Sequence, residues 1–315
     1  MTESKRGLFR YLRMKYFGDE EFADDPAEVD RIPVTAPDLE RIHRPAESLR
    51  ITWIGHATAL VQFPGLTILT DPVFSERASP VSFAGPKRVL PPALSLDQLP
   101  PVDVVLISHN HYDHLDGPTV QNLGNSVLWI VPLGLKSWFE GKGVSPERVR
   151  EFDWWDSAEI QGAQITAAPM QHWSARGFGD RNETLWASWA VERDGFSFWF
   201  CGDTGYNSVQ FKKIGERFGG FDLAMIPIGA YDPRWFMKNA HVNPEEAVKI
   251  HAEIQSNFTV AHHWGTFRLT AEPLDEPPGR LGEAMAAAGD LPPFLALAVG
   301  ETREIEAATR KPVSE

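Results

Sequence analysis

The sequence has little of what marks secreted or membrane-spanning proteins. Its 315 residues include one cysteine, Cys201, which excludes an internal disulfide framework and a thiolate-bound zinc cluster. No run reaches the roughly 18 apolar residues that a membrane span needs, and the first residues lack the apolar segment of a secretory signal. We therefore expect no signal peptide and no transmembrane segment, and a cytoplasmic protein whose membrane contact is at most peripheral.

Basic residues are also scarce. The chain has 30 Lys and Arg against 43 Asp and Glu, a formal charge of −13. A general nucleic-acid binder would present a basic surface, so we expect no nucleic-acid partner. Hydrophobic residues make up 43% of the chain and include 11 Trp, which supplies a large core and excludes global disorder.

The charges are unevenly distributed near the N-terminus. Residues 5–15 contain five bases and no acid, whereas residues 19–30 contain seven acids and no base. The basic stretch fits either an amphipathic helix on an anionic membrane or a segment that packs on its own domain or stays partly disordered. We divide the chain into an irregular N-terminal extension (1–48), one large domain (49–300) and a loose, polar C-terminal tail (301–315).

Apolar runs of strand type recur along the domain, with helix-like stretches between them. A helix is predicted from Asn243, because Asn, Pro and Glu in the order of residues 243–246 make an N-cap and first turn. This alternation predicts a single large α/β domain. The predicted strands are Ile51–Ile54, Ala59–Phe63, Leu66–Leu69, Val102–Ile107, Val127–Val131, Gln164–Ala168, Trp186–Val191, Ser197–Phe200, Leu223–Ile228 and Phe258–Ala261.

The strongest chemical signal is the segment Ser-His-Asn-His-Tyr-Asp-His at residues 108–114, directly after a predicted strand. Four potential ligands crowd into six residues, and a divalent metal is the reason to tolerate that crowding. The alternate spacing of His109 and His111 suits an extended loop that points both at one ion. Asp113 and His114, beyond the bend, can face a second ion.

Three more predicted strands end on a possible ligand: His172, Asp203 and His263. Sites gather where strands end and loops begin in layered α/β folds. Convergence of these ends would place His172 with His109 and His111, and His263 with Asp113 and His114, with Asp203 between the two ions. Taken alone, Asp203 also fits a turn, and His262 could replace His263.

In this order, the His-x-His-x-Asp-His segment and the later His, Asp and His resemble the metallo-β-lactamase superfamily. Flanking blocks resemble its N-acyl-phosphatidylethanolamine-hydrolysing phospholipase D branch, over roughly residues 50–300. The resemblance implies an αββα sandwich of two mixed sheets flanked by helices. It also implies two Zn²⁺ ions, a zinc-bound hydroxide, a phospholipid substrate and, in many members, a homodimer. The blocks lie at residues 52–58, 69–72, 77–88, 153–155, 202–206, 226–231, 233–238 and 263–267.

The implied reaction is hydrolysis of N-acyl-phosphatidylethanolamine or a related phospholipid to phosphatidic acid and an N-acylethanolamine, by a hydroxide that bridges the metals. Other divalent metals fit the same ligands. The alternative is a metal-dependent lactonase or another hydrolase of the superfamily that acts on a small phosphorylated substrate.

Further residues are candidates for the chemistry around the metals. Asp113 and Asp203 are expected to be catalytic as well as ligating, and His241, by resemblance, to donate a proton near the substrate phosphate. Asp71 and His56 are expected to orient ligand imidazoles, although Asp71 also fits a Thr-Asp-Pro turn and His56 a satisfied core histidine. The candidate substrate-binding residues are Lys87, Arg88, Tyr206, Arg234 and Trp235.

Overall fold

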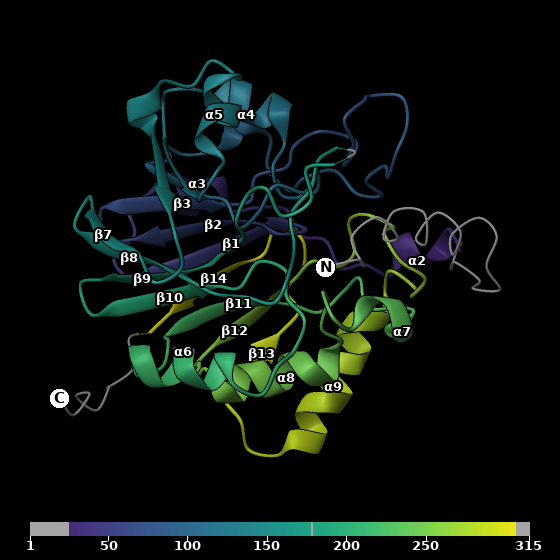
Figure 1. The fold of residues 1–315 in the computed structure, drawn as a ribbon. Coiled ribbons are helices and arrows are strands. Elements are labelled where there is room, and N and C mark those ends of the chain that lie inside the picture. Colours follow the sequence, from purple (N-terminus) through teal and green to yellow (C-terminus); the bar gives the residue numbers. More distant parts are fainter. Residues whose placement is uncertain (1–24, 178, 307–315) are drawn as a thin grey trace.

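The computed structural model describes residues 25–177 and 179–306, which form two seven-stranded β-sheets stacked face to face with helices outside them (Figure 1). The first sheet has the order β14-β1-β2-β3-β4-β5-β6 and the second the order β13-β12-β11-β10-β9-β8-β7. Both are mixed sheets, with hairpins on one side and parallel pairs on the other. The strands of the first sheet are β1 Leu49–Gly55, β2 Thr58–Phe63, β3 Leu66–Thr70, β4 Val104–Leu106, β5 Leu128–Pro132, β6 Val149–Phe152 and β14 Thr302–Ile305. Those of the second are β7 Ser157–Ile160, β8 Ala163–Ala168, β9 Ser188–Arg193, β10 Phe196–Phe200, β11 Leu223–Pro227, β12 Thr259–His262 and β13 Phe294–Leu295.

The central strands are buried along almost their whole length because both faces of each sheet are covered. Successive side chains of a strand point to opposite faces. In β2, Val61 therefore packs between the sheets, whereas Leu60 packs under the helices on the outside. In β4, Val104 and Val105 divide in the same way.

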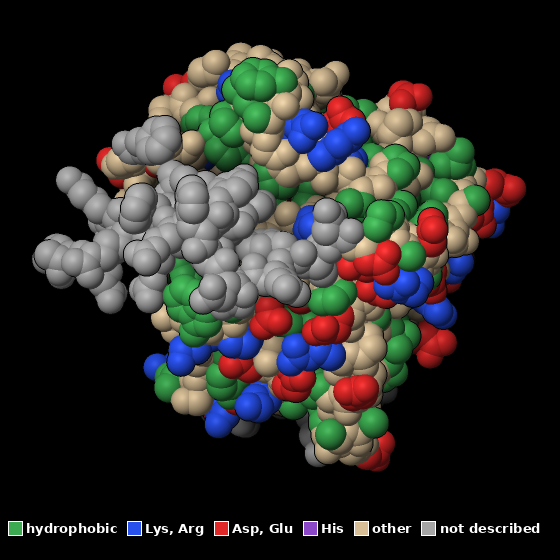
Figure 2. Space-filling view, turned by 90° about the vertical axis from the view of Figure 1, so that its right-hand side faces the viewer, with side chains coloured by type: hydrophobic (Ala, Val, Ile, Leu, Met, Phe, Trp, Pro, Cys, Tyr) green, Lys and Arg blue, Asp and Glu red, His purple; other side chains and the backbone are tan. Residues whose placement is uncertain are grey.

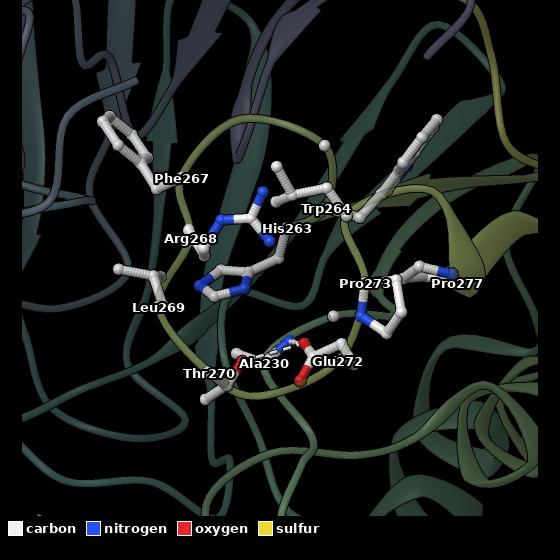
Figure 3. Close-up of a pocket in the computed structure, with 13 residues that line it drawn as sticks. Ala230, His263, Trp264, Phe267, Arg268, Leu269, Thr270, Glu272, Pro273 and Pro277 are labelled. Carbon is white, nitrogen blue, oxygen red and sulfur yellow. Dashed lines mark hydrogen bonds between the residues drawn. The ribbon is translucent and has the colours of Figure 1, made fainter. Parts of the chain in front are cut away.

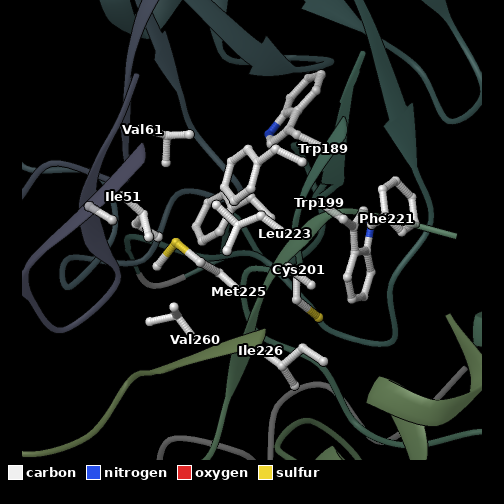
Figure 4. Close-up of a cluster of buried hydrophobic side chains, with 14 of the residues drawn as sticks. Ile51, Val61, Trp189, Trp199, Cys201, Phe221, Leu223, Met225, Ile226 and Val260 are labelled. Carbon is white, nitrogen blue, oxygen red and sulfur yellow. The ribbon is translucent and has the colours of Figure 1, made fainter. Parts of the chain in front are cut away.

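The layer between the sheets holds the largest side chains of the core. Figure 4 shows Ile51 and Val61 from the first sheet facing Trp189, Leu223 and Met225 from the second. All five side chains are fully buried. Burial of one such side chain contributes about 1.5–3 kcal/mol, so this layer is the main source of stability for the strand ends that carry the site.

Helices cover the outer face of each sheet (Figure 1). The expected helix after Asn243 is confirmed: the Asn243 side chain accepts from Glu246 N at 3.0 Å, and Glu246 completes the capping box. The first sheet is covered by α3 Leu39–His43, α4 Gly117–Leu123 and α5 Lys136–Glu140. The second is covered by α6 Gln210–Phe218, α8 Pro244–Glu253 and α9 Glu276–Ala288. Short elements are α2 Ala27–Asp30, α7 Arg234–Met237, η2 Leu96–Gln98 and η3 Pro146–Arg148.

The αββα architecture expected from the resemblance is confirmed, but four strands were missed. The expected loose tail is wrong for Thr302–Ile305, which pair antiparallel with β1 as the edge strand β14. The sequence of β14 is polar because an edge strand is largely exposed to solvent, and its backbone hydrogen bonds to β1 hold it in the sheet. The edge strands β6 and β7 were missed for the same reason, because half or more of the residues of each are exposed or half-buried. The strand β13 was missed because it has only two residues.

Residues 25–48, expected to be irregular, contain the helices α2 and α3 and pack on the domain. Ile42 of α3 is fully buried in the outer core of the first sheet, and Val34 bridges Val299. The basic stretch at residues 5–15 lies outside the described residues, so its two interpretations stay open, and the division into extension, domain and tail stays a prediction. No helix within the described ranges is long and apolar enough to cross a membrane. The face in Figure 2 carries interspersed basic and acidic side chains.

Candidate metal centre

Four strand ends bring the histidines and aspartates together. His109 follows β4, His172 follows β8, Asp203 follows β10 and His263 follows β12 directly. The backbone turns sharply at these ends. Gly202 has φ +65° and packs so tightly that an added Cβ would lie 2.6 Å from the Ser108 side chain, so the glycine beside Asp203 is required by close approach.

Three imidazoles form the first ligand group. The Nδ1 atom of His111 lies 2.9 Å from His109 Nε2 and 3.3 Å from His172 Nε2. Zinc–nitrogen bonds of about 2.0–2.1 Å in tetrahedral geometry separate neighbouring ligand atoms by about 3.3 Å. The two measured separations are close to this spacing, and one ligand atom from each of the three residues lies within 4.8 Å of the others, so the group could hold one ion.

Asp113, His114 and His263 form the second group. Asp113 Oδ2 lies 3.5 Å from His114 Nε2 and 3.3 Å from His263 Nε2. His56 stands beside this group, with its Nε2 atom 3.1 Å from Asp113 Oδ2. His262 does not belong to this group, because its ring packs on Phe200 with 5.5 Å between the ring centres. His263, rather than His262, is therefore the member of the group.

Asp203 lies between the two groups. Its Oδ2 atom is 3.1 Å from His263 Nε2 and 3.2 Å from His114 Nε2 on one side. On the other side it is 3.9 Å from both His109 Nε2 and His172 Nε2. One carboxylate oxygen thus reaches both groups, which is the geometry of a bridging ligand.

The unpaired atoms of the cluster fit a pair of divalent metals. His114 Nε2, His263 Nε2 and Asp203 Oδ1 are buried and have no hydrogen-bond partner in the described part of the chain. Buried polar atoms without partners cost about 1–3 kcal/mol each. Imidazole nitrogens and carboxylate oxygens are preferred ligands of zinc and similar ions, so bound cations would satisfy these atoms together.

The charges of the cluster are also suited to cations. Burial lowers the pKa of His111 and His172 to about 3, so these rings are neutral and can use a lone pair. Burial raises the pKa of Asp203, but His114 and His263 outweigh it and hold that pKa well below its usual range. In return, Asp203 and Asp113 overcome burial and raise the pKa of His263 to about 9. Without metal, the two carboxylates thus hold protons on neighbouring rings.

Contacts behind the ligands fix their orientation. Asp71 accepts from His114 Nδ1 at 2.6 Å and from Ser108 N at 2.7 Å. The Ala240 carbonyl accepts from His172 Nδ1 at 2.9 Å. Such partners hold a metal-binding imidazole in one tautomer and one orientation. Asp71 also has φ +30°, so the turn and the orienting contact predicted for it occur in the same residue.

His56 supports His263 through the backbone. The His56 carbonyl accepts from His263 N at 3.1 Å and from Trp53 Nε1 at 3.0 Å. Both histidines have left-handed backbone, φ +53° at His56 and +62° at His263. This conformation is costly for residues other than glycine and is often found at functional sites.

His241 lies next to the cluster without belonging to either ligand group of three. Its Nδ1 atom is 3.8 Å from Asp203 Oδ2, and its ring is 5.1 Å from that of His172. Burial lowers its pKa to about 3, so the ring is neutral. Arg234 holds this segment by donating to the His241 carbonyl at 2.8 Å and to Glu246 at 2.6 Å.

A small cavity of about 20 Å³ adjoins His263 (Figure 3). Glu272, on its wall, accepts from Ala230 N at 2.6 Å and from Asp232 N at 3.1 Å. Those contacts fix the loop that passes Gly229, where a Cβ would lie 2.1 Å from the His263 carbonyl oxygen. The cavity is large enough for about one water molecule and too small for a substrate.

The structure brings together all seven predicted ligands, with His56, Asp71 and His241 beside them, but not most of the predicted substrate contacts. Lys87 pairs with Glu76 at 2.7 Å. Tyr206 donates to Glu253, at the end of α8 opposite Asn243.

The guanidinium of Arg88 donates to three backbone carbonyls and lies 5.2 Å from the Phe267 ring, so its hydrogen bonds serve the loop around it, and its substrate-binding role stays a prediction. The Trp235 ring is half exposed and packs on Phe236, which leaves its predicted role open.

Arg176, in the segment after His172, was missed as a residue that holds the ligand loop. Arg176 donates to the carbonyls of Asn110 and Leu115, both at 2.7 Å, and so holds the loop that carries His109 to His114. The Trp173 ring lies 4.2 Å from that of His111. No local pattern reveals the Arg176 contacts, since they join residues more than 60 positions apart.

The arrangement agrees with comparisons with known proteins. A sequence profile described as "Beta-lactamase superfamily domain" matches residues 67–264. The chain belongs to this superfamily. It is 47% identical over 266 residues to N-acyl-phosphatidylethanolamine-hydrolyzing phospholipase D 1 of Caenorhabditis elegans, covering 80% of this chain and 75% of that protein. It is 36% identical over 274 residues to the mitochondrial N-acyl-phosphatidylethanolamine-hydrolyzing phospholipase D of Saccharomyces cerevisiae, covering 82% and 58%.

Among solved structures, Igni18, a metallo hydrolase of Ignicoccus hospitalis, matches with a TM-score of 0.61 and 19% identity, covering 82% of this chain and 99% of that one. At this identity the likeness establishes the fold alone. The family match, the two phospholipase D relatives and a metal-dependent hydrolase of Methanopyrus kandleri, 30% identical over 237 residues and covering 73% of this chain and 88% of that protein, identify the chain as a metal-dependent hydrolase of the beta-lactamase superfamily.

Proposed function

We propose that this chain is a phosphodiesterase of phospholipase D type that hydrolyses N-acyl-phosphatidylethanolamine or related phospholipids to phosphatidic acid and N-acylethanolamine. The observation that carries the proposal is the pair of ligand groups that share Asp203 Oδ2. A site for two adjacent ions is typical of enzymes that cleave phosphate esters. The names of the Caenorhabditis and Saccharomyces relatives support this substrate class.

We assign the residues as follows. His109, His111 and His172 would hold one ion and Asp113, His114 and His263 the other, with Asp203 shared. Zinc suits these ligands, and other divalent metals are compatible with them. When bound, two such ions supply positive charge to phosphate oxygens and activate water near neutral pH.

The side chains contribute orientation and hydrogen bonding. Asp113 and Asp203 keep their negative charge because their pKa values lie well below the usual range. Asp71 and the Ala240 carbonyl hold the imidazoles of His114 and His172 in place. His241 is neutral and reaches the same space, so we assign it a hydrogen bond to the substrate phosphate or its leaving oxygen rather than a fixed positive charge.

The decisive experiment is mass-spectrometric product analysis on a mixed phospholipid panel, with protein of measured metal content. Phosphatidic acid and N-acylethanolamine should appear in equal amounts, and chelation should stop their release. A sugar-phosphate lactone should be assayed in parallel. Lactone turnover without phosphatidic acid would contradict the proposal and favour the alternative hydrolase.

A further inference from the structure

The segment after His172 forms an anchored loop, which we define as residues 174–182; Phe178 lies outside the described residues. Ser174 and Asn182 close its base, with Asn182 N donating to the Ser174 carbonyl at 2.8 Å and Ser174 N to the Asn182 side chain at 3.3 Å. The Asp180 carboxylate accepts from the backbone N–H groups of Arg176 and Gly177, both at 2.9 Å. Asp180 and Asn182, which flank Arg181 in the sequence, are therefore both held by hydrogen bonds.

The anchored loop is attached to the candidate metal centre. Arg176 joins it to the carbonyls of Asn110 and Leu115, on either side of the ligands His111 to His114. The guanidinium of Arg181 lies 4.1 Å from the centre of the Trp173 ring. That ring lies 4.2 Å from the ring of His111. One aromatic side chain thus separates the Arg181 charge from a proposed ligand.

Arg181 carries a charge that no acid neutralises within residues 25–177 and 179–306. Its one described contact is with Trp173, and its pKa is lowered by burial alone, without a carboxylate among the causes. The other bases considered for an anion differ: Lys87 pairs with Glu76 and Arg234 with Glu246. A stacked guanidinium keeps its N–H groups in a plane and free for an oxyanion.

We propose that Arg181, stacked on Trp173, binds a phosphate oxyanion of the substrate at the rim of the metal centre. The recognised chemistry is a phosphate group, whether it belongs to a lipid head group or to free phosphate. The lipid form of this inference rests on the proposed function.

Isothermal titration calorimetry on metal-loaded protein tests the proposal by binding, independently of turnover. The probes are dihexanoyl phosphatidic acid and inorganic phosphate, titrated into wild type and Arg181→Gln. The matched control is Arg217→Gln, because the Arg217 guanidinium also stacks on a tryptophan, 4.6 Å from the Trp155 ring, and is exposed on α6. Metal content and melting temperature are measured for each protein.

We expect Arg181→Gln to weaken binding of both probes about tenfold, equivalent to about 1.4 kcal/mol, and Arg217→Gln to leave it unchanged. Arg181→Lys should fall between, since it keeps the charge but loses the planar stack. Unchanged affinity for both probes in Arg181→Gln overturns the proposal. If Arg181→Gln loses affinity for inorganic phosphate but not for dihexanoyl phosphatidic acid, the oxyanion site is supported and the phospholipid function is contradicted. Failure of the Arg181 proposal and failure of the proposed function therefore give different results.

Discussion

Replacement of Asp71 by Asn separates the two roles that this residue combines. Asparagine has nearly the same shape and tolerates the left-handed backbone at φ +30°. The turn after β3 should therefore form as before. The change removes the negative charge and leaves one acceptor oxygen where the carboxylate has two.

The structure sets the size of the effect. The carboxylate accepts from Ser108 N at 2.7 Å, from the Ser108 hydroxyl and from His114 Nδ1 at 2.6 Å. One amide oxygen cannot serve both the backbone and the imidazole, so one hydrogen bond to a fully buried group is lost. Loss of such an orienting partner typically lowers metal affinity about 10- to 100-fold. We expect this loss of affinity for the ion held by the group of His114. The affinity of the group that contains His109 should change little.

Competition with a chromophoric chelator measures the two affinities separately. The matched control is Asp222→Asn, because Asp222 is also fully buried and accepts from both the backbone N–H and the hydroxyl of one serine, Ser197, at 2.8 and 3.1 Å. The control should destabilise the fold without weakening metal binding. Wild-type affinity for both ions in Asp71→Asn would show that the residue serves the turn alone. Equal losses in the two variants would attribute the effect to general destabilisation.

Four further predictions concern the metal centre, the α8 cap and the N-terminal stretch. Asp203→Asn should lower turnover at least about 10²-fold and weaken both ions, measured by steady-state kinetics and metal analysis; full turnover with two ions bound would reject the bridging role. Metal loading at pH 7 should release protons from His114 and His263, seen as buffer-dependent heats in calorimetry. The part released by His263, like the stability that its proton gives the metal-free protein, is complete below pH 6.5 and is lost as the pH rises through the His263 pKa of about 9. Burial lowers the pKa of His114, but Asp203 and Asp113 outweigh it and raise that pKa well above its usual value. A pH-independent heat would contradict this release of protons. Asn243→Ala should cost about 1 kcal/mol of unfolding free energy by loss of the α8 cap; an unchanged denaturation midpoint would contradict that. Deletion of residues 1–18 should reduce hydrolysis of vesicles but not of soluble substrate, and equal vesicle activity would dismiss the membrane-binding interpretation.

The sequence was sufficient to predict which candidate ligands gather in one cluster, because their signal is local. The segment from His109 to His114 is dense enough to predict a metal on its own, and His172, Asp203 and His263 stand at the ends of apolar runs that are indeed strands. Which strand ends meet at one edge is a matter of topology, and periodicity carries no information about it. The grouping of these ends around two ions was a hypothesis that assumed the strand ends converge, and the order of strands in the two sheets now explains why they do.

Prediction failed where a residue's role depends on distant partners. Arg88 was a candidate substrate-binding residue in the sequence, and the structure shows it donating to three carbonyls, one of them of Leu90 and two from the loop at residues 73–75. Arg181 was overlooked, although the fold stacks it on Trp173. Lysine and arginine are mostly exposed whatever they bind, so composition and spacing do not distinguish a paired base from a free one. Only the tertiary structure shows which carboxylates lie within reach.

The cluster makes sense energetically only as a site prepared for cations. Burial holds His56, His111 and His172 neutral, and several of the cluster's ring nitrogens have no partner among the described residues. His56, Asp71 and His263 add left-handed backbone to that cost. A chain selected for stability alone would place apolar side chains here, as it does between the sheets. Because the strand ends are fixed by the core, the ligands stay in place before any ion arrives, and binding need not bear the cost of ordering them. Variants that loosen those strand ends should therefore weaken metal binding even where no ligand is changed.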